Sequence, residues 1–173
     1  MKFNTIKLEE IAIRTVICPG DLGYIIYRHG AMYAKEYNHG VSFEVYVAKG
    51  ICEFYQNYDA NKDRVWLCEH KGKIIGSIFL QHRENRTAQL RFFYLESKYR
   101  GLGLGKLLMG LFMDFYRECG YTSSYLWTTD ELDTAAGLYQ KHGYVLEQEV
   151  KTKVFGKPLI ERKYQLGQLL TNN

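Results

Sequence analysis

The sequence predicts an α/β fold in which helices flank a mixed, mostly antiparallel β-sheet, with the order β-α-α-β-β-β-α-β-α-β-β. The first observation behind this prediction is that apolar residues repeat at a helical period in some segments and alternate in others. The second is that glycines separate these segments at positions typical of turns. The third is size: 173 residues, of which 46% are hydrophobic and 24% charged, are typical of a single globular domain, expected to span residues 1–173.

The first half of the chain is expected to contain one strand, two helices and three further strands. Residues 6–17 include an alternating stretch that predicts the first strand. Asp21 is expected to cap a helix that runs to about Tyr37, and Ser42 to cap a second helix. The strands expected next are residues 64–69, 74–81 and 88–95, with turns at 70–73 and 83–86.

The second half is expected to alternate helices and strands and to end in a strand pair. Gly120 is expected to stop the first of these helices, whose apolar face repeats at i, i+3, i+4, i+7, i+8 and i+11. The residues of this face are Leu104, Leu107, Leu108, Leu111, Phe112 and Phe115. The remaining elements are a strand at 125–128, a helix at 133–142 and two strands after Gly143, joined by a turn at 155–158.

Composition and charge exclude several classes of function. The four cysteines lie far apart and match no zinc-ligand spacing, so we expect reduced thiols and no metal site. A net charge of +4 favours an anionic ligand but is too small and too dispersed to indicate nucleic acid. No run approaches the ~18 consecutive apolar residues of a membrane span, and the first residues lack the apolar core of an export signal. We therefore expect a cytoplasmic protein with no membrane partner.

The most informative segment is Tyr99–Lys106, YRGLGLGK, which follows an expected strand and opens an expected helix. Backbone N–H groups at a helix start carry partial positive charge, and glycines let a phosphate approach them closely. Three alternating glycines, Gly101, Gly103 and Gly105, exceed what a tight turn needs. The segment therefore predicts a phosphate-bearing ligand, with a ligand-free strand-to-helix turn as the alternative.

The spacing of the glycines excludes two common phosphate-binding motifs. A dinucleotide fingerprint, GxGxxG, would need its last glycine at Lys106 or Leu108. A nucleoside-triphosphate loop, GxxxxGK followed by Ser or Thr, would need a glycine at Arg100 and a hydroxyl at Leu107. Because these residues do not fit, we expect neither a dinucleotide nor a magnesium-bound nucleotide.

The loop does match the pattern (Arg/Gln)-x-x-Gly-x-(Gly/Ala), which is met by Arg100, Gly103 and Gly105. At this point the sequence resembles the GNAT superfamily of N-acetyltransferases. The next helix carries a second feature typical of that family, a Leu-Tyr pair followed by Gly and an aromatic residue, in 138–144. The resemblance extends over residues 64–165. Residues 28–44 are similar to the region preceding GNAT domains fused to marR-type regulators, although the sequence has no helix-turn-helix pattern.

By this resemblance the ligand is acetyl-CoA, used as a co-substrate and without a metal. Its pyrophosphate is expected on the loop amides. Its pantetheine arm is expected along the end of the preceding strand, from which residues 126–128 would splay away. The loop amides are those of Arg100, Gly101, Leu102, Gly103, Leu104, Gly105 and Lys106, and the strand end is Phe93, Tyr94 and Leu95. The side chains of Lys98, Arg100 and Lys106 either attract a phosphate or are ordinary solvated charges.

The resemblance also implies that an amine attacks the thioester directly, in a ternary complex of enzyme, acetyl-CoA and acceptor. The backbone N–H of Leu95 is expected to donate to the oxyanion, and the hydroxyl of Tyr139 to the departing sulfur. An alkylamine, with a pKa of ~10.4, is mostly protonated at neutral pH, so a base is needed. The candidate bases are Glu96, the nearest carboxylate in sequence, and as alternatives Glu44, Glu69, His29 or a water relay.

The acceptor stays open between a small-molecule amine and a protein amino group. Tyr33, Tyr37 and Glu44 are expected to bind it. Tyr24, Tyr27 and Tyr46 either join the same aromatic wall or belong to the core.

Two further expectations concern how this chain differs from its relatives. Many of them place Asn seven residues before the tyrosine, where this chain has Leu132, so ligand contacts at that helix start are expected to differ. The competing interpretation of the whole chain is a non-catalytic acyl-CoA-binding sensor. The final strand pair offers an edge through which two copies could form a homodimer.

Overall fold

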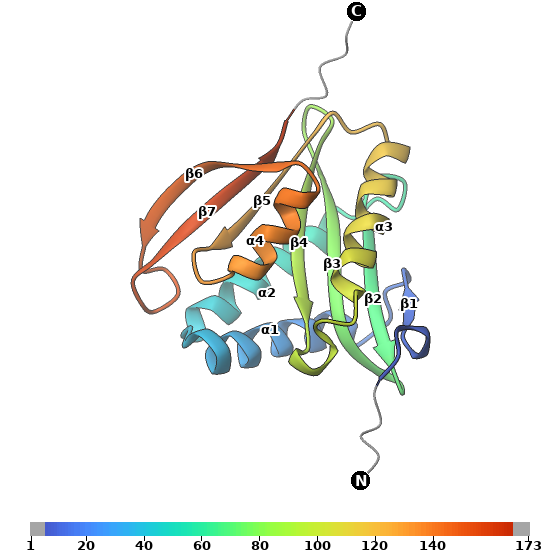
Figure 1. The fold of residues 1–173 in the computed structure, drawn as a ribbon, viewed down its shortest axis with the longest axis horizontal. Helices are drawn as coiled ribbons and strands as arrows, with labels where there is room; N and C mark the ends of the chain where they lie inside the picture. The colour runs from blue at the N-terminus through green and yellow to red at the C-terminus, as the bar shows by residue number, and fades with distance from the viewer. Residues whose placement is uncertain (1–5, 168–173) are drawn as a thin grey trace, which may run out of the picture.

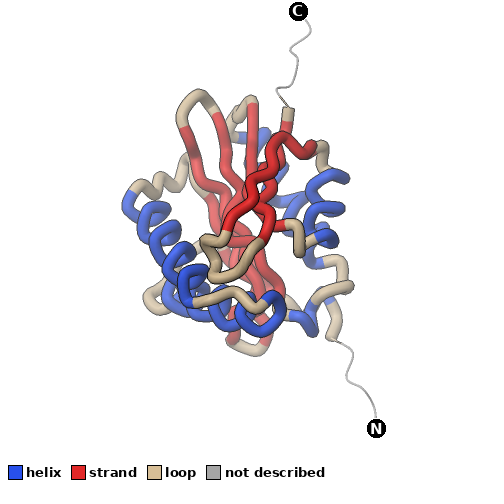
Figure 2. The backbone as a smooth tube through the Cα atoms, turned by 90° about the vertical axis from the view of Figure 1, so that its left-hand side faces the viewer, coloured by secondary structure: helices blue, strands red, loops and turns tan. Residues whose placement is uncertain are grey.

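The computed structural model describes residues 6–167. These residues form a seven-stranded sheet with the order β1-β2-β3-β4-β5-β7-β6, and helices cover both of its faces (Figures 1 and 2). β4 and β5 are parallel and the other neighbours antiparallel, which confirms the expected fold class and element order. The elements are η1 (Leu8–Glu10), β1 (Ala12–Arg14), α1 (Asp21–Tyr37), α2 (Val41–Gln56), β2 (Arg64–His70), β3 (Lys73–Arg83), β4 (Thr87–Leu95), η2 (Ser97–Tyr99), α3 (Leu104–Glu118), β5 (Ser123–Thr129), α4 (Asp133–Lys141), β6 (Tyr144–Thr152) and β7 (Leu159–Leu166).

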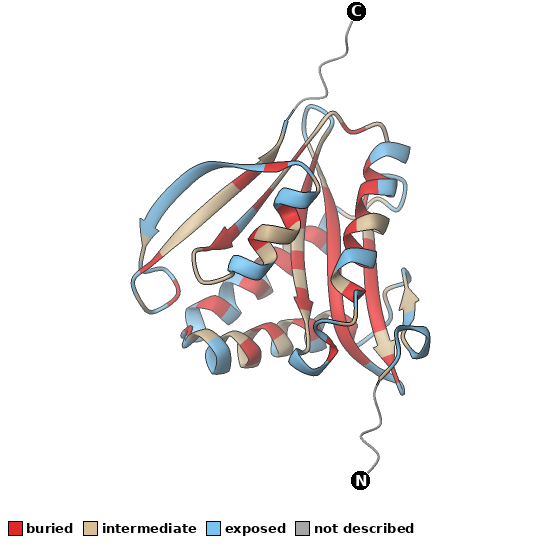
Figure 3. Ribbon diagram, viewed as in Figure 1, coloured by how far each residue is buried: buried red, intermediate tan, exposed pale blue. Residues whose placement is uncertain are grey.

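The core follows from the alternation of side chains along the central strands. Val65 and Leu67 of β2 pack in the layer of α1 and α2. Trp66 and Cys68 alternate with them and pack in the layer of α3 and α4. β3 is buried on both faces over most of its length because both helix layers cover it (Figure 3). Each face of the sheet therefore carries its own apolar cluster, and the two clusters fix the strands that border the site.

The starts of the first two helices differ from the sequence-based expectation because glycines precede them. α1 follows Gly20, whose φ of 96° is left-handed, so Asp21 is the first helical residue rather than the cap. The Asp21 carboxylate instead accepts a hydrogen bond from the Arg14 guanidinium at 2.6 Å. α2 begins directly after Gly40, so Ser42 lies inside the first turn and makes no capping bond.

The buried face of α3 is rotated relative to the expected one. Leu107 is 40% exposed, whereas Met109, Met113 and Tyr116 are buried. α3 packs across the sheet, and its docking direction selects which side chains are covered. Methionines suit this layer because their flexible side chains fill irregular gaps. Periodicity thus predicted the helix correctly but not its rotation.

β4 contains a bulge at Phe92 that changes the direction of its side chains. Phe92 has a φ of 49°, a left-handed value that is costly for an aromatic residue. The β3–β4 register shifts here, and both Arg91 and Phe92 contact the layer of α1 and α2. The buried hydroxyl of Ser77 donates a 2.6 Å hydrogen bond to the carbonyl of Phe92. This bond holds the bulge in place.

Beyond the start of the pair, β4 and β5 separate. Their parallel pairing covers only 87–89 and 123–125, and the two strands then diverge (Figure 1). Facing edges of two separated strands keep N–H and C=O groups that the ladder does not satisfy. This opening is the framework of the site.

The β6–β7 hairpin curves away from the rest of the sheet and leaves β6 exposed along most of its length (Figures 1 and 3). Its turn nevertheless returns to the corner between α1 and α2. There the N–H of Gly40 donates to the carbonyl of Phe155 at 2.8 Å. The turn thereby closes one side of the opening between β4 and β5.

Replacing Ser77 by alanine is expected to lower the free energy of unfolding by about 1–3 kcal/mol, because the Phe92 carbonyl would stay buried without its donor. Urea unfolding at neutral pH measures this change. Ser42→Ala, on the exposed surface of α2, is the matched control and should change stability by less than about 0.5 kcal/mol. Equal values for the two variants would show that the bulge does not need the Ser77 hydroxyl.

Candidate active site

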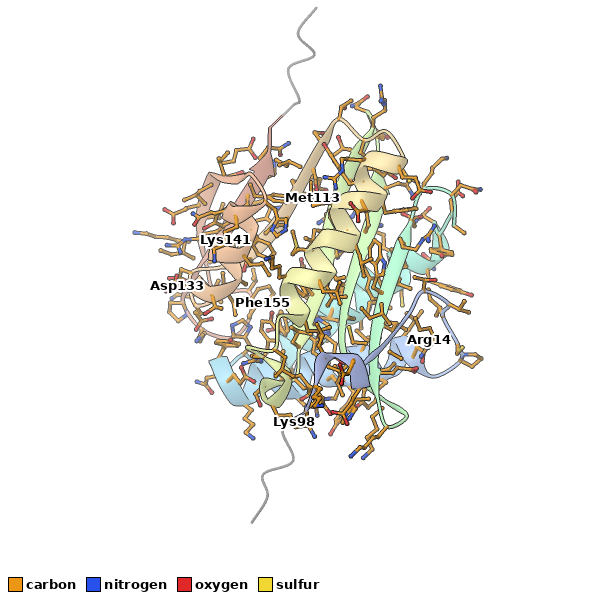
Figure 4. All side chains as sticks on the ribbon, turned by 45° about the vertical axis from the view of Figure 1, so that its right-hand side comes forward. Arg14, Lys98, Met113, Asp133, Lys141 and Phe155 are labelled. Carbon is orange, nitrogen blue, oxygen red and sulfur yellow. The ribbon has the colours of Figure 1, made fainter. Side chains whose placement is uncertain are left out.

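A cleft of about 900 Å³ opens where β4 and β5 separate. Its lining comes from α1, α2, the ends of β4 and β5, the glycine loop with the start of α3, α4, and the β6–β7 turn. In Figure 4, Asp133 and Lys141 mark the two ends of α4, and Phe155 belongs to the β6–β7 turn. Segments far apart in sequence therefore meet around one space.

The glycine loop presents backbone amides to this cleft. Gly101 and Gly103 have φ values of 79° and 87°, which favour glycine. A Cβ added at either residue would meet nothing within 4 Å, so both face open space. The first helical hydrogen bond of α3 runs from the N–H of Leu107 to Gly103 O at 3.0 Å, so the earlier amides have no partner within the helix. Free amides beside open space are what an anion requires.

Not every backbone N–H of the loop amides expected to bind the pyrophosphate is free of a protein partner. The N–H of Arg100 donates to the carbonyl of Ser97 at 3.2 Å, which closes η2. The free amides therefore begin at Gly101, one residue later than expected. Leu104 is buried and Leu102 packs against the same apolar cluster, so both offer the cleft backbone rather than side chain.

The Arg100 guanidinium is a structural group, in contrast to its expected role as a free cation. It donates to both carboxylate oxygens of Glu36 on α1, at 2.7 and 3.0 Å, and to the carbonyl of Leu95 at 3.0 Å. Lys98 lies over the ring of the residue that follows it, 5.1 Å from the centroid. Lys106 lines the cleft. Arg100 thus fastens the loop to α1, and Lys106 is the expected cation that faces the cleft.

The end of β4 directs its backbone into the gap. The N–H of Glu96 donates to the carbonyl of Ile75 on β3 at 2.9 Å. Because successive residues of a strand point their N–H groups to opposite sides, the N–H of Leu95 points away from β3 and toward the gap left by β5. Phe93 and Tyr94 line the cleft together with Leu95. This is the direction that an oxyanion donor at Leu95 needs.

Across the gap, the end of β5 carries two hydroxyls without a hydrogen-bond partner in the described part of the chain. They belong to Thr128 and Thr129, and both oxygens are buried. Both residues line the cleft. Buried hydroxyls are normally paired, so these two indicate a place where polar groups of a ligand are received.

Tyr139 reaches from α4 to the end of β4. Its side chain is 5% exposed, and its ring centroid lies 6.3 Å from that of Phe93. Burial raises the pKa of the Tyr139 hydroxyl, so this group is protonated at neutral pH. A protonated hydroxyl at the wall of the cleft is able to donate a hydrogen bond or a proton.

The carboxylates expected as bases lie in ion pairs or outside the cleft. Glu96 accepts two hydrogen bonds from Arg28 of α1, at 2.5 and 2.8 Å. Glu69 accepts two from Arg14, at 2.7 and 3.2 Å. Glu44 lies between α1 and α2 and, like Glu96 and Glu69, is outside the lining. Glu96, expected as the base, is thus held in an ion pair with Arg28, and Glu44, expected to contact the acceptor, has an exposed side chain outside the lining of the cleft.

His29 does line the cleft, but as a neutral group. Its Nδ1 donates to the carbonyl of Ile25, one helical turn earlier, at 2.9 Å, which leaves Nε2 as an acceptor. Burial lowers the pKa of His29 to about 4, and the bond to Ile25 opposes this only in part. His29 therefore accepts hydrogen bonds at neutral pH but binds a proton weakly.

For two of the carboxylates that line the cleft, no pattern in the sequence predicted a place in the site. Glu131, between β5 and α4, is hydrogen-bonded to Nε2 of His39 at 2.8 Å and to the ammonium of Lys157. Glu161 lies on β7 opposite Thr129 of β5. Both line the cleft, yet each resembles an ordinary surface charge in its own segment. They face the cleft only because the β6–β7 hairpin folds back beside β5.

Aromatic side chains form the wall on the side of α1 and α2. Tyr33, Tyr37 and Tyr46 line the cleft, joined by Phe155 from the β6–β7 turn. The phenyl ring of Phe155 lies 5.3 Å from that of Tyr46, centroid to centroid. Of the tyrosines considered in the sequence, Tyr24 and Tyr27 lie outside this lining.

Within residues 6–167, no group of His, Cys, Asp and Glu side chains is arranged to hold a metal ion. None of the helices in that range is long and apolar enough to cross a membrane.

Comparison with known proteins identifies the family. A sequence model of the acetyltransferase (GNAT) family matches residues 29–144, which is more than half of the chain. The chain belongs to the GNAT family of acetyltransferases. The match includes the glycine loop and Tyr139, so the two local motifs and the family agree.

Individual GNAT relatives are similar at moderate identity. Escherichia coli K12 N-acetyltransferase YjgM is 33% identical over 95 residues, which cover 53% of this chain and 57% of that protein. The chain spans about half the length of the curated relatives it matches.

Solved structures of GNAT proteins share the fold. A GNAT-family acetyltransferase from Staphylococcus aureus Mu50 has a TM-score of 0.72 at 21% identity, covering 91% of this chain and 99% of that one. Spermidine N-acetyltransferase from Vibrio cholerae, solved in complex with CoA and spermine, has a TM-score of 0.67 at 19% identity, covering 92% and 96%.

The buried neutral His29 predicts a loss of stability at acid pH. The unfolded chain protonates this residue below pH 6.5, but the folded chain does so only near pH 4. Stability should therefore be unaffected by His29 above pH 6.5 and fall between pH 6.5 and 4, by up to about 1.4 kcal/mol per pH unit. Urea unfolding at pH 7 and pH 5 should show wild type losing about 2 kcal/mol more than His29→Asn. Equal losses would contradict a neutral, buried imidazole.

Proposed function

We propose that this protein transfers the acetyl group of acetyl-CoA to a primary amine, by direct attack of the amine on the thioester in a ternary complex. The observation that carries the proposal is that one cleft joins three parts: the free amides of the glycine loop, the Leu95 edge with Tyr139, and an aromatic pocket with carboxylates. These parts suit a diphosphate, a thioester and an amine respectively. Membership of the GNAT family supports the same reaction.

The residues of the cleft fit acetyl-CoA. Gly101 and Gly103 leave open space above free amides, where side chains would exclude a diphosphate. The β4 edge at Leu95 and the unpaired hydroxyls of Thr128 and Thr129 offer donors and acceptors to the amide groups of a pantetheine arm. When bound, acetyl-CoA supplies an acyl carbon activated by a thiolate leaving group.

The chain contributes two donors to the reaction. The N–H of Leu95 stabilises the negative charge that develops on the carbonyl oxygen, because it is already directed into the gap. The Tyr139 hydroxyl donates to the sulfur as its bond to carbon breaks. A hydrogen bond is sufficient here, because a thiol with a pKa of ~8.5 loses its proton more easily than a phenol of pKa ~10.

The acceptor pocket favours a cationic amine. The rings of Tyr33, Tyr37 and Tyr46 offer π-faces to an ammonium group, and Glu131 offers a carboxylate. One structural neighbour is named as a spermidine N-acetyltransferase and was solved with spermine. A small-molecule amine is therefore the first acceptor to test, and a protein amino group the second.

The proposed reaction is tested by an acceptor screen against acetyl-CoA. Spermidine, 2-phenylethylamine and a peptide with a free α-amino group are incubated with the protein, and release of CoA thiol and the mass of the product are measured. Acetylation of one of these amines supports the proposal. Binding of acetyl-CoA without turnover of any amine would favour the acyl-CoA sensor instead.

Gly103→Val is expected to abolish stabilisation by acetyl-CoA. The new side chain would fill the open space at the loop amides, and the residue would be strained at its φ of 87°. Acetyl-CoA at 100 times its Kd should stabilise wild type by about 2.7 kcal/mol, measured as a thermal shift, and the variant not at all. Gly110→Ala, inside α3 with open space around it, is the control and should keep the ligand shift. An unchanged shift in Gly103→Val would place the diphosphate elsewhere.

Tyr139→Phe is expected to lower kcat by about 100-fold or more, because the departing sulfur loses its donor. KM for acetyl-CoA should stay within about threefold of wild type, since the ring and its packing remain. Steady-state kinetics with an amine found in the screen measure both constants. Tyr55→Phe, on the exposed surface of α2, is the control and should leave them unchanged. A kcat of Tyr139→Phe equal to that of wild type would show that the Tyr139 hydroxyl takes no part in the reaction.

A further inference from the structure

Three carboxylates line the cleft, and the two that are not largely exposed, Glu131 and Glu161, have different surroundings. The side chain of the third, Asp133, is 89% exposed and lies 3.8 Å from Arg162. Glu131 is bonded to His39 and Lys157. Burial opposes ionisation of Glu131, but these two bonds outweigh it and hold the pKa of Glu131 below its usual value. Glu161 has no ion-pair or hydrogen-bond partner for its side chain among residues 6–167, and burial raises its pKa. Two carboxylates in one cleft with pKa values pushed apart are typical of different roles in acid–base chemistry.

The sheet directs Glu161 toward the acceptor side of the cleft. Glu161 lies opposite Thr129 in the β5–β7 ladder. Tyr164, three residues later on β7, packs against Tyr139 in the layer of α3 and α4, with 6.4 Å between ring centroids. Because side chains alternate along a strand, Glu161 faces the opposite layer, that of α1 and α2. The aromatic pocket lies in that layer.

Glu161 also lies at the right depth along the sheet. The last paired residues of β4 and β5 are Gln89 and Tyr125. Three residues further along, β4 has reached the bulge at Phe92 and β5 has reached Thr128. Glu161, beside the next residue of β5, therefore faces the bulge across the gap. Counted in this way, Glu161 is level with Phe93, two residues before Leu95, which is roughly 7 Å along the strand. An amine that attacks a thioester carbonyl held at the Leu95 N–H would lie between this N–H and Glu161.

The other charged groups around Glu161 already have partners. Lys163, on the same face of β7, is paired with Glu147 at 2.8 Å and lies over the ring of Tyr125. Arg91, on β4, donates to Glu53 and to Gln81, each at 3.0 Å. Opposite Glu161, β6 presents the uncharged Val150, and β5 presents the uncharged Thr129. The titratable groups that remain in the acceptor pocket are Tyr33, Tyr37, Tyr46, Tyr94, His29 and Glu131.

We propose that Glu161 is the general base of the reaction and takes the proton from the acceptor ammonium. In this step one N–H bond of the ammonium breaks, and the proton moves to the Glu161 carboxylate. The freed lone pair forms the C–N bond to the acetyl carbon as the C–S bond breaks. The second proton lost by nitrogen balances the proton taken up by the thiolate, and Glu161 returns its own proton to solvent. The inference rests on the proposed function.

Glu131 complements Glu161 rather than replacing it. Its carboxylate is shared with Lys157 and His39, so it attracts an ammonium group but has little tendency to accept a proton. Glu161 has the opposite properties, because no cation neutralises it and its proton affinity is raised. In the cleft, Glu131 thus holds the amine and Glu161 deprotonates it.

The test compares Glu161→Gln with wild type over a pH series from 6 to 10, with spermidine and 2-phenylethylamine as acceptors. Without a base, only the unprotonated amine reacts, which at pH 7 is less than about one molecule in a thousand for a pKa of ~10.4. We therefore expect kcat/KM to fall by about 100-fold or more at pH 7. The deficit should shrink as the pH approaches the pKa of the amine. A purely structural role would give a deficit that does not depend on pH.

Two further variants complete the design. Glu161→Asp keeps a carboxylate and should retain the pH profile of wild type at a lower rate. Glu149→Gln makes the same change on the neighbouring strand, outside the cleft, and should leave the kinetics unchanged. The thermal shift with acetyl-CoA should be equal in all variants, because Glu161 lies on the acceptor side.

The outcomes separate this inference from the proposed function. Turnover by wild type together with Glu161→Gln within about threefold of it at pH 7, or with a deficit that is the same at every pH, overturns the role of Glu161 alone. Absence of CoA release by wild type with every amine overturns the proposed function and this inference with it. Loss of activity in Glu161→Gln that recovers at high pH supports both.

Discussion

The separation of β4 from β5 is the constraint on which the site depends. The two strands pair over three residues and then leave each other, so the β4 edge at Leu95 points its N–H into a gap rather than to a neighbouring strand. The bulge at Phe92, held by the Ser77 hydroxyl, turns this edge at the same level. A regular β4–β5 ladder would satisfy the backbone of Leu95 and fill the space that the cleft occupies.

Ion pairs and the hairpin turn hold the walls of this gap together. Arg28 and Glu36 of α1 pair with Glu96 and Arg100, which flank η2 between β4 and the glycine loop. The β6–β7 turn joins the α1–α2 corner through a backbone hydrogen bond to Phe155. These contacts explain why the carboxylate nearest to the thioester in sequence is not a free base. It belongs to the framework, and the unpaired carboxylate of the cleft comes from β7.

The parts of the site that depend on local backbone were predictable from the sequence. The glycines at 101 and 103 adopt left-handed φ values at a helix start, and Tyr139 lies on the helix and in the position that the second motif indicates. The sequence did not reveal that Glu96 pairs with Arg28 of α1 or that the Glu44 side chain lies beside Gly30 of α1. Neither contact leaves a pattern in the residues around the carboxylate.

The sequence by itself determined the order of helices and strands, the mixed sheet and the loop that opens α3. These follow from short-range effects, namely the periodicity of apolar residues and the conformational freedom of glycine. The tertiary structure alone decided the rotation of α3, the exclusion of Tyr24 and Tyr27 from the pocket and the presence of Glu131 and Glu161 in it. Burial and ionisation depend on neighbours that are distant along the chain, so only the folded arrangement of the layers specifies them.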